Sequence, residues 1–205
     1  MARPAFGGTS GDGGVKTTAA VPVTGIPSGK LGMWLFLASE VMFFTGLLGA
    51  YIVLRAGLGS WPHPGEELHI PAAALNTFIL LSSSMTMALS VAAVHRADRV
   101  KLRLFLVFTI LLGLAFLSVK GYEYSQKFAH GHFPGTGIFW DCYFTLTGVH
   151  GLHVLAGILT NLWVLGLTFR DDFLETRGHF VEVSGLYWHF VDVVWIFLFP
   201  LVYLI

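Results

Sequence analysis

Residues 142–169 read CYFTLTGVHGLHVLAGILTNLWVLGLTF and contain no Lys, Arg, Asp or Glu. A helix needs about 20 consecutive, mostly apolar residues to cross the hydrocarbon core of a bilayer, so this stretch is long enough to span it. Strands of a membrane barrel alternate between apolar and polar residues over about 10 positions. This stretch is longer and continuously apolar. It therefore predicts a transmembrane helix.

Four other stretches have the same character. Residues 72–94 and 104–119 carry no charge, whereas 31–54 contains only Glu40 and 183–205 contains only Asp192. Because the intervening loops are short, we expect helices that are adjacent in sequence to be antiparallel neighbours in space. The sequence predicts an all-α integral membrane bundle of five transmembrane helices, near residues 30–56, 71–95, 102–127, 140–169 and 182–205.

The composition of the whole chain agrees with this fold class. It has 205 residues, of which 55% are hydrophobic and 12% charged, and its mean hydropathy is +0.71. A soluble domain carries about 25% charged residues, and a disordered chain is poor in aromatic residues, so both classes are excluded. Twelve basic residues balance twelve acidic ones, which leaves no basic footprint for nucleic acid. The single cysteine, Cys142, excludes an intrachain disulfide.

The N-terminal residues 1–29 are rich in Gly, Ala, Thr, Pro and Ser, without periodicity, and we expect a flexible tail followed by one domain over 30–205. The distribution of Lys and Arg predicts a cytoplasmic N-terminus and a C-terminus outside, because basic residues concentrate on the cytoplasmic side of membrane proteins. On this orientation two basic residues in loops, Arg55 and Lys127, lie outside. The inside holds Arg3, Lys16, Lys30, Arg96, Arg99, Lys101, Arg103, Arg170 and Arg177.

Ionisable residues inside the membrane are the candidate functional groups, because such groups usually face the protein interior or a cavity. Three sets have i,i+3 spacing and so share a helix face: His150 with His153, His189 with Asp192, and Lys120 with Glu123. We expect Lys120 and Glu123 to neutralise each other, and Asp192 to accept a hydrogen bond from His189 or from a histidine of the preceding helix. Glu40 is either a protonated carboxyl at a helix contact or a group that exchanges protons or contacts lipid headgroups.

Metal binding is weakly supported by the sequence. A zinc or di-iron site needs three or more convergent ligands, and the histidine spacing of membrane hydroxylases is absent. Haem ligation by two facing histidines of the last two helices stays possible at this stage. His130 and His132, in a glycine-rich loop, are expected to be solvated.

Several motifs resemble subunit III of the haem–copper oxygen reductases, the cytochrome c oxidase and quinol oxidase family, in its five-helix bacterial form. They are Leu75-Asn76-Thr77, Glu123-Tyr124, and three longer runs: KLGMWLFLASEVMFF at 30–44, TGVHGLHVLAG at 147–157 and YWHFVDVVW at 187–195. The likeness covers roughly residues 28–205. The chain departs from the family at Lys120, where many relatives have an amide.

The resemblance implies an accessory subunit without catalytic residues, metal or cofactor of its own. Haem and copper are then expected in partner subunits, with bound phospholipid on this chain. The implied partners are oxidase subunit I as the main contact, subunit II, small subunits and a respiratory supercomplex, in a bacterial inner membrane. Glu40 matches the family's buried carboxyl, with a lipid-related or proton-related role. The expected structural or lipid-contacting polar residues are Asn76, Lys120, Glu123, His150, His153, Glu182, His189 and Asp192.

The implied function is to stabilise subunit I, bind phospholipid and support proton uptake during reduction of oxygen to water. Cytochrome c and quinol both remain open as electron donors, and an accessory role beside a nitric oxide reductase is a further possibility within the family. Two functions of another class also remain open: a small proton or ion transporter that uses Glu40 and the histidines, and a haem-b membrane anchor.

Overall fold

The computed structural model describes residues 28–59, 61–62, 68–170 and 173–204, so the predicted tail over 1–27 lies outside the described residues. The described part is helical and contains no strand. Five helices, the last one continued by a π-helical turn, are long and apolar enough to cross a membrane, and their bounds agree with the predicted ones to within three residues. The elements are α1 (Ser28–Gly57), α3 (Ile70–His95), α4 (Arg99–Ala129), α5 (Ile138–Leu167), the short α6 (Phe173–Thr176), α7 (His179–Phe199) and the π-helical η1 (Pro200–Leu204).

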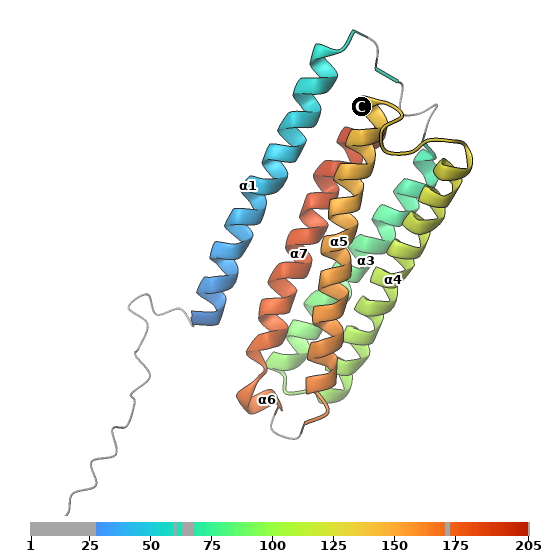
Figure 1. Cartoon of the computed structure of the whole chain (residues 1–205). Coiled ribbons are helices and arrows are strands. Elements are labelled where there is room, and N and C mark those ends of the chain that lie inside the picture. The colour runs from blue at the N-terminus through green and yellow to red at the C-terminus, as the bar shows by residue number, and fades with distance from the viewer. Residues whose placement is uncertain (1–27, 60, 63–67, 171–172, 205) are drawn as a thin grey trace, which may run out of the picture.

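Four of these helices form a closed bundle. α3 packs on α4, α4 on α5, α5 on α7, and α7 returns to α3. α1 lies outside this ring and packs mainly on α7, with a smaller contact on α5. Figure 1 shows α1 along one flank and α3 and α4 on the other, with α5 and α7 between them. We expected α1 to pack on α3, the next long helix in sequence, and this was wrong. α1 packs on α7 and α5 instead, so the short loop between α1 and α3 does not decide its neighbours.

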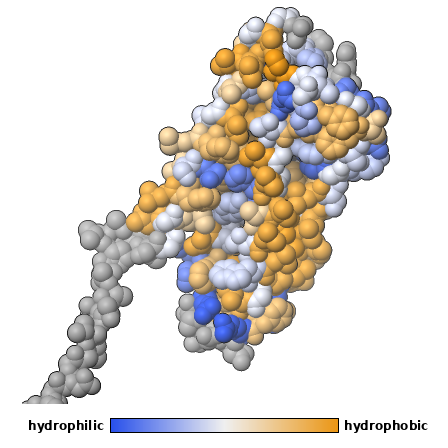
Figure 2. Space-filling model, in the orientation of Figure 1, coloured by the Kyte–Doolittle hydropathy of each residue, from blue (hydrophilic) through white to orange (hydrophobic). Residues whose placement is uncertain are grey.

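α1 is also the least buried helix. In its most apolar window 17% of the residues are buried, against 50% for the span made by α7 and η1. Figure 2 shows apolar residues over much of the visible face, including α1, with hydrophilic residues gathered at the two ends and beside α1. An apolar exterior of this extent suits a lipid environment or a hydrophobic partner, because exposed apolar surface in water is unfavourable.

Trp188 is the centre of the packing between three helices. It lies on α7, is 1% exposed, and reaches glycines of the two neighbouring helices. A Cβ atom on Gly157 of α5 or on Gly113 of α4 would lie 2.8 Å from its ring atoms. These two glycines therefore make the space that the indole occupies, and they allow α4 and α5 to approach α7 closely.

The ends of two helices are set by local chemistry. Asp98 caps the N-terminus of α4, because its Oδ1 accepts a hydrogen bond from the Lys101 amide at 3.1 Å. This backbone bond, followed by the contacts of the Lys101 side chain, lowers the pKa of Asp98 below its usual value. Near the C-terminus, Pro200 ends the α-helical part of the last span, and residues 200–204 form a π-helical turn.

Substituting Gly157 tests the packing around Trp188. We expect Gly157→Ala to destabilise the protein by about 1–3 kcal/mol, since the indole must move to make room for the methyl group. The matched control is Gly166→Ala on the same helix, where an added Cβ meets nothing within 4 Å. Thermal unfolding of the purified protein measures the difference. Equal midpoints for the two variants would contradict the assigned role of Gly157.

Substituting Asp98 tests the pH dependence of the cap. Because the folded-state pKa is lowered, the charged cap stabilises the fold above the usual carboxyl pKa of 3.8 and loses this effect as the pH falls through the folded-state pKa. Asn also caps helices, so Asp98→Asn removes only the charge. We expect the thermal midpoint of the wild type to exceed that of Asp98→Asn slightly at neutral pH, and the difference to vanish in acid. A difference that grew on acidification would be the opposite result.

Candidate functional site

The most extensive buried polar group lies near the end of the bundle where α4 meets α5. We call it the Lys120 cluster: Lys120 and Glu123 from α4, Tyr143 from α5 and Tyr203 from η1. Lys120 Nζ donates to Glu123 Oε2 at 3.0 Å and also to the Tyr203 hydroxyl. The two tyrosine hydroxyls donate to Glu123 Oε1 at 2.8 and 2.9 Å. The predicted pairing of Lys120 with Glu123 is thus confirmed.

Burial makes this pairing necessary. Lys120 and Glu123 are each 7% exposed, and an unpaired charge in such surroundings is strongly unfavourable. The ammonium also lies 4.8 Å from the ring centroid of Tyr203 and 5.1 Å from that of Trp195, distances at which an aromatic face attracts a cation. The cluster therefore joins α4, α5 and the C-terminal turn through one desolvated ion pair.

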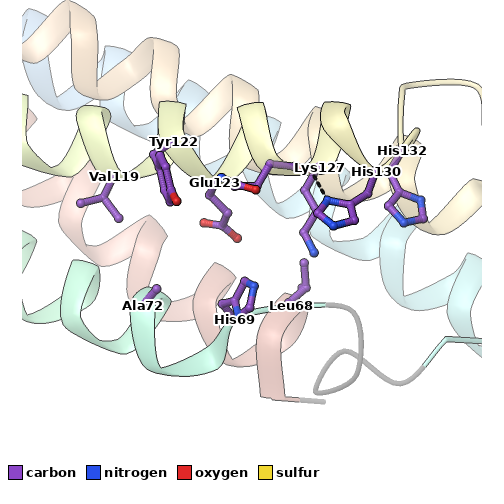
Figure 3. A pocket seen from close by; sticks show the side chains of 10 residues that line it. Leu68, His69, Ala72, Val119, Tyr122, Glu123, Lys127, His130 and His132 are labelled. Atoms are coloured by element: carbon purple, nitrogen blue, oxygen red, sulfur yellow. Dashed lines mark hydrogen bonds between the residues drawn. The ribbon is translucent and has the colours of Figure 1, made fainter.

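Glu123 also lines a pocket of about 730 Å³ between the start of α3 and the end of α4. Figure 3 shows Glu123 and His69 facing each other across this pocket, with Lys127 and His130 farther along it. His130 is exposed, as predicted. His132 is half-buried and stacks on Trp140 with 4.1 Å between ring centroids, so its prediction as a fully solvated side chain was wrong.

Glu40 meets His153 where α1 packs on α5. Glu40 Oε2 lies 3.1 Å from His153 Nε2, and His153 Nδ1 lies 2.8 Å from the carbonyl oxygen of Val149. Because a carbonyl only accepts, Nδ1 carries a hydrogen. The contact at Nε2 then needs one more proton, held either by the carboxyl or by the imidazole. The pair therefore shares a single proton at the interface of α1 with the bundle.

Glu182 joins three helices at the opposite end of the bundle. It lies on α7, forms an ion pair with Lys30 of α1, and has its Oε1 2.7 Å from His95 Nε2 of α3. The sequence offered no spacing signal for this contact, because the three residues are far apart in the chain.

The central polar residues behave differently from expectation. His189 Nδ1 lies 2.7 Å from the Ser84 hydroxyl of α3. Asp192 is 3% exposed, and neither carboxylate oxygen has a hydrogen-bond partner within the described residues. The predicted hydrogen bond from His189 or from a histidine of the preceding helix to Asp192 was therefore wrong. Lying on the same helix face does not give His189 and Asp192 a hydrogen bond, since the His189 ring turns toward Ser84 of α3.

His150 and Asn76 lie in the same central region. His150 is fully buried between aromatic rings, 4.9 Å from the centroid of Trp195 and 5.7 Å from that of Phe116. Neither of its nitrogens has a hydrogen-bond partner in the described part of the chain. Asn76 donates to the carbonyl oxygen of Phe116 at 3.4 Å. His150 and His153 thus point to different neighbours, although they share one helix face.

Several polar contacts were not predicted. Tyr143 and Tyr203 were not among the predicted site residues, yet both complete the Lys120 cluster. Ser184 of α7 donates to Asn161 Oδ1 of α5 at 2.7 Å, and both residues are buried. The second contact could have been predicted from Asn161, an amide side chain in a stretch without charged residues, because a buried amide needs a hydrogen-bond partner.

Among the described residues no group of three or more His, Cys, Asp or Glu side chains could hold a metal ion. Aromatic rings pack on His150, and the Ser84 hydroxyl contacts Nδ1 of His189. What the geometry does provide is a set of interhelical contacts between charged or polar groups.

Removing one member of the Lys120 pair tests its importance. We expect Lys120→Met to destabilise the protein by about 3–5 kcal/mol, because Glu123 is left buried without its cation. The double variant Lys120→Met/Glu123→Gln should recover most of this loss. Lys101→Met is the matched control, since Lys101 forms an i,i+3 pair with Asp98 on the surface of the same helix and should change stability far less. Thermal unfolding provides the readout, and a double variant as unstable as the single one would contradict the coupling.

The chain is similar to proteins of known family. The chain matches the family described as cytochrome c oxidase subunit III over residues 14–205. It is 40% identical over 179 residues to cytochrome c oxidase subunit 3 of Corynebacterium diphtheriae, covering 86% of this chain and 87% of that protein. It is 41% identical over 176 residues to the protein of the same name from Synechocystis, covering 85% and 74%, and 38% identical over 176 residues to that of Thermostichus vulcanus, covering 85% and 86%.

Proposed function

Because the chain belongs to the cytochrome c oxidase subunit III family, we propose that it serves as the non-redox accessory subunit of a proton-pumping terminal oxidase. In this role it packs beside the catalytic subunit I, binds phospholipid and supports proton uptake. Subunit II and small subunits complete the complex, which operates in the bacterial inner membrane and reduces oxygen to water. The relatives are named for cytochrome c, and we infer the same electron donor here.

One observation carries the non-redox assignment. The charged residues of the membrane-spanning helices are mostly used to join helices. The Lys120–Glu123 pair of α4 binds Tyr143 and Tyr203. Glu40 contacts His153, and Glu182 contacts Lys30. Groups engaged in this way hold helices together, and they leave no convergent set of ligands for a redox centre within the described residues. Haem and copper are accordingly assigned to the partner subunits.

The proton-related role centres on Glu40. It is the one acidic residue on α1, its side chain is 18% exposed, and its Oε2 lies 3.1 Å from His153 Nε2. A partly accessible pair that holds one proton can release and regain it without separating charge over a long distance. This supports a part for Glu40 in proton uptake beside subunit I.

Affinity purification in mild detergent tests the assignment. We expect the chain to co-purify with a large haem-containing subunit, and the isolated chain to show no haem absorption. Co-purification of an unrelated complex, or a haem spectrum from the isolated chain, would contradict it. Proteoliposomes that hold the chain alone should conduct no ions, whereas a transporter would.

Glu40→Gln tests the shared proton. Glutamine keeps a hydrogen bond to His153 but cannot carry the exchangeable proton, so the fold and the haem spectrum of the complex should not change. We expect the oxidase to lose activity severalfold faster during continuous turnover. Ser39→Ala, at the neighbouring position of α1, is the control, because the Ser39 hydroxyl bonds only to its own helix at the Phe36 carbonyl. An unchanged turnover lifetime in Glu40→Gln would refute the proton role.

A further inference from the structure

Asp192 is a buried carboxyl at the seam between α3 and α7. Two hydrogen bonds join these helices on either side of it: the Ser84 hydroxyl lies 2.7 Å from His189 Nδ1, and Trp195 Nε1 donates to the Thr77 hydroxyl at 2.9 Å. Asp192 comes between His189 and Trp195 in the sequence of α7, and its side chain lies beside that of Ser84. The seam therefore places one carboxyl among polar side chains that carry no fixed charge.

The carboxyl has no cation to balance a negative charge. Neither of its oxygens has a hydrogen-bonded cation among the residues that the structure describes, and the buried cation Lys120 is bonded to Glu123 instead. An isolated carboxylate in an apolar interior is so unfavourable that the group takes up a proton. Asp192 is accordingly held as the neutral acid, which can donate a hydrogen bond, whereas a carboxylate only accepts.

Ser84 can pass a proton between Asp192 and His189. Its hydroxyl both donates one hydrogen and accepts another, and it lies beside the carboxyl and 2.7 Å from His189 Nδ1. A protonated Asp192 can donate to Ser84 Oγ, which leaves the Ser84 hydrogen for Nδ1. A neutral imidazole that accepts at Nδ1 carries its own hydrogen at Nε2. The three groups thus form a chain from the buried acid to the far nitrogen of the imidazole.

His189 is the outward end of this chain. It is half-buried, whereas Asp192 is 3% exposed. Val193 follows His189 by one helical turn and is 48% exposed, and Met85, next to Ser84 on α3, is 62% exposed. This side of the seam therefore faces out of the bundle, and the imidazole connects the interior with the surface.

We propose that Asp192, Ser84 and His189 form a proton-storage site, in which the buried acid exchanges its proton with the surface of the bundle through the hydroxyl and the imidazole. On release, Asp192 gives its proton to Ser84 Oγ, Ser84 gives its hydrogen to Nδ1, and Nε2 loses its proton to a water molecule at the surface. Three bonds to hydrogen break and three form, no electron is transferred, and a carboxylate is left. Uptake is the reverse.

The storage site deepens the proton-related part of the proposed function. It adds a second group that holds a proton, on the opposite side of α7 from the α5 helix that carries the partner of Glu40. The site rests on the proposed function only for the use that the oxidase makes of the proton, since the acid and its relay belong to this chain.

Infrared difference spectroscopy of the full chain in lipid nanodiscs tests the storage. A protonated carboxylic acid gives a C=O stretching band separate from those of carboxylates and amides, and the band shifts when deuterium replaces the proton. We expect the spectrum of the wild type minus that of Asp192→Asn to show this band at neutral pH. Isotope labelling of the aspartate carboxyl carbon identifies the same band without a substitution. Absence of the band would mean that Asp192 is ionised and would overturn the proposal.

Ser84→Ala tests the relay. It removes the bridging hydroxyl and keeps Asp192, so the acid band should persist while its shift in deuterated buffer becomes about tenfold slower, which corresponds to a barrier higher by about 1.4 kcal/mol. His189→Gln should slow the shift as well. Ser82→Ala is the matched control, because the Ser82 hydroxyl bonds to the Phe78 carbonyl oxygen of its own helix. Equal rates in Ser84→Ala and Ser82→Ala would refute the relay.

Both measurements use this chain alone and do not depend on partner subunits. A missing band, or exchange that Ser84→Ala leaves unchanged, would therefore refute the storage site and leave the subunit III assignment standing, since that assignment is tested by co-purification.

Discussion

An unpaired charge in the hydrocarbon core of a membrane is the state that this fold avoids. Lys120 shows the constraint most clearly, because its ammonium is buried and meets Glu123, a tyrosine hydroxyl and three aromatic faces. The contacts come from α4, α5, α7 and η1, so one buried cation fixes how the C-terminal turn closes on the bundle. Asp192 is also buried, and the Ser84 side chain lies beside it.

The same constraint explains how α1 is held. α4, α5 and α7 pack around Trp188, and α3 packs on α4 and α7, whereas α1 contributes few buried residues. Its polar contacts are Lys30 with Glu182 near one end and Glu40 with His153 near the middle. Both partners lie on the bundle, on α7 and α5. These polar contacts add to the small apolar contact that Leu37 and Phe44 give α1.

The sequence alone predicted the parts that depend on neighbouring residues. Continuous apolar runs located five helices, and i,i+3 spacing identified the pair of Lys120 and Glu123. Contacts between distant residues were not predictable in this way. The partners of Glu40 and Glu182 depend on the packing of α1 against α7 rather than α3, and the His189 ring could turn either to Asp192 on its own helix or to Ser84 on another. The resemblance to subunit III pointed to the residues, but it gave none of their contacts.

The central claim is that polar contacts fasten α1 to the bundle, and a distance measurement tests it most directly. Spin labels at Met42 of α1 and Val193 of α7, both exposed, would report the separation of the helices in lipid nanodiscs, with Cys142 replaced by Ala. In the double variant Glu40→Leu/Glu182→Leu, which removes both polar contacts, this account predicts a longer and broader distribution of distances than in the labelled parent. An unchanged distribution would contradict it and would show that apolar packing alone holds α1.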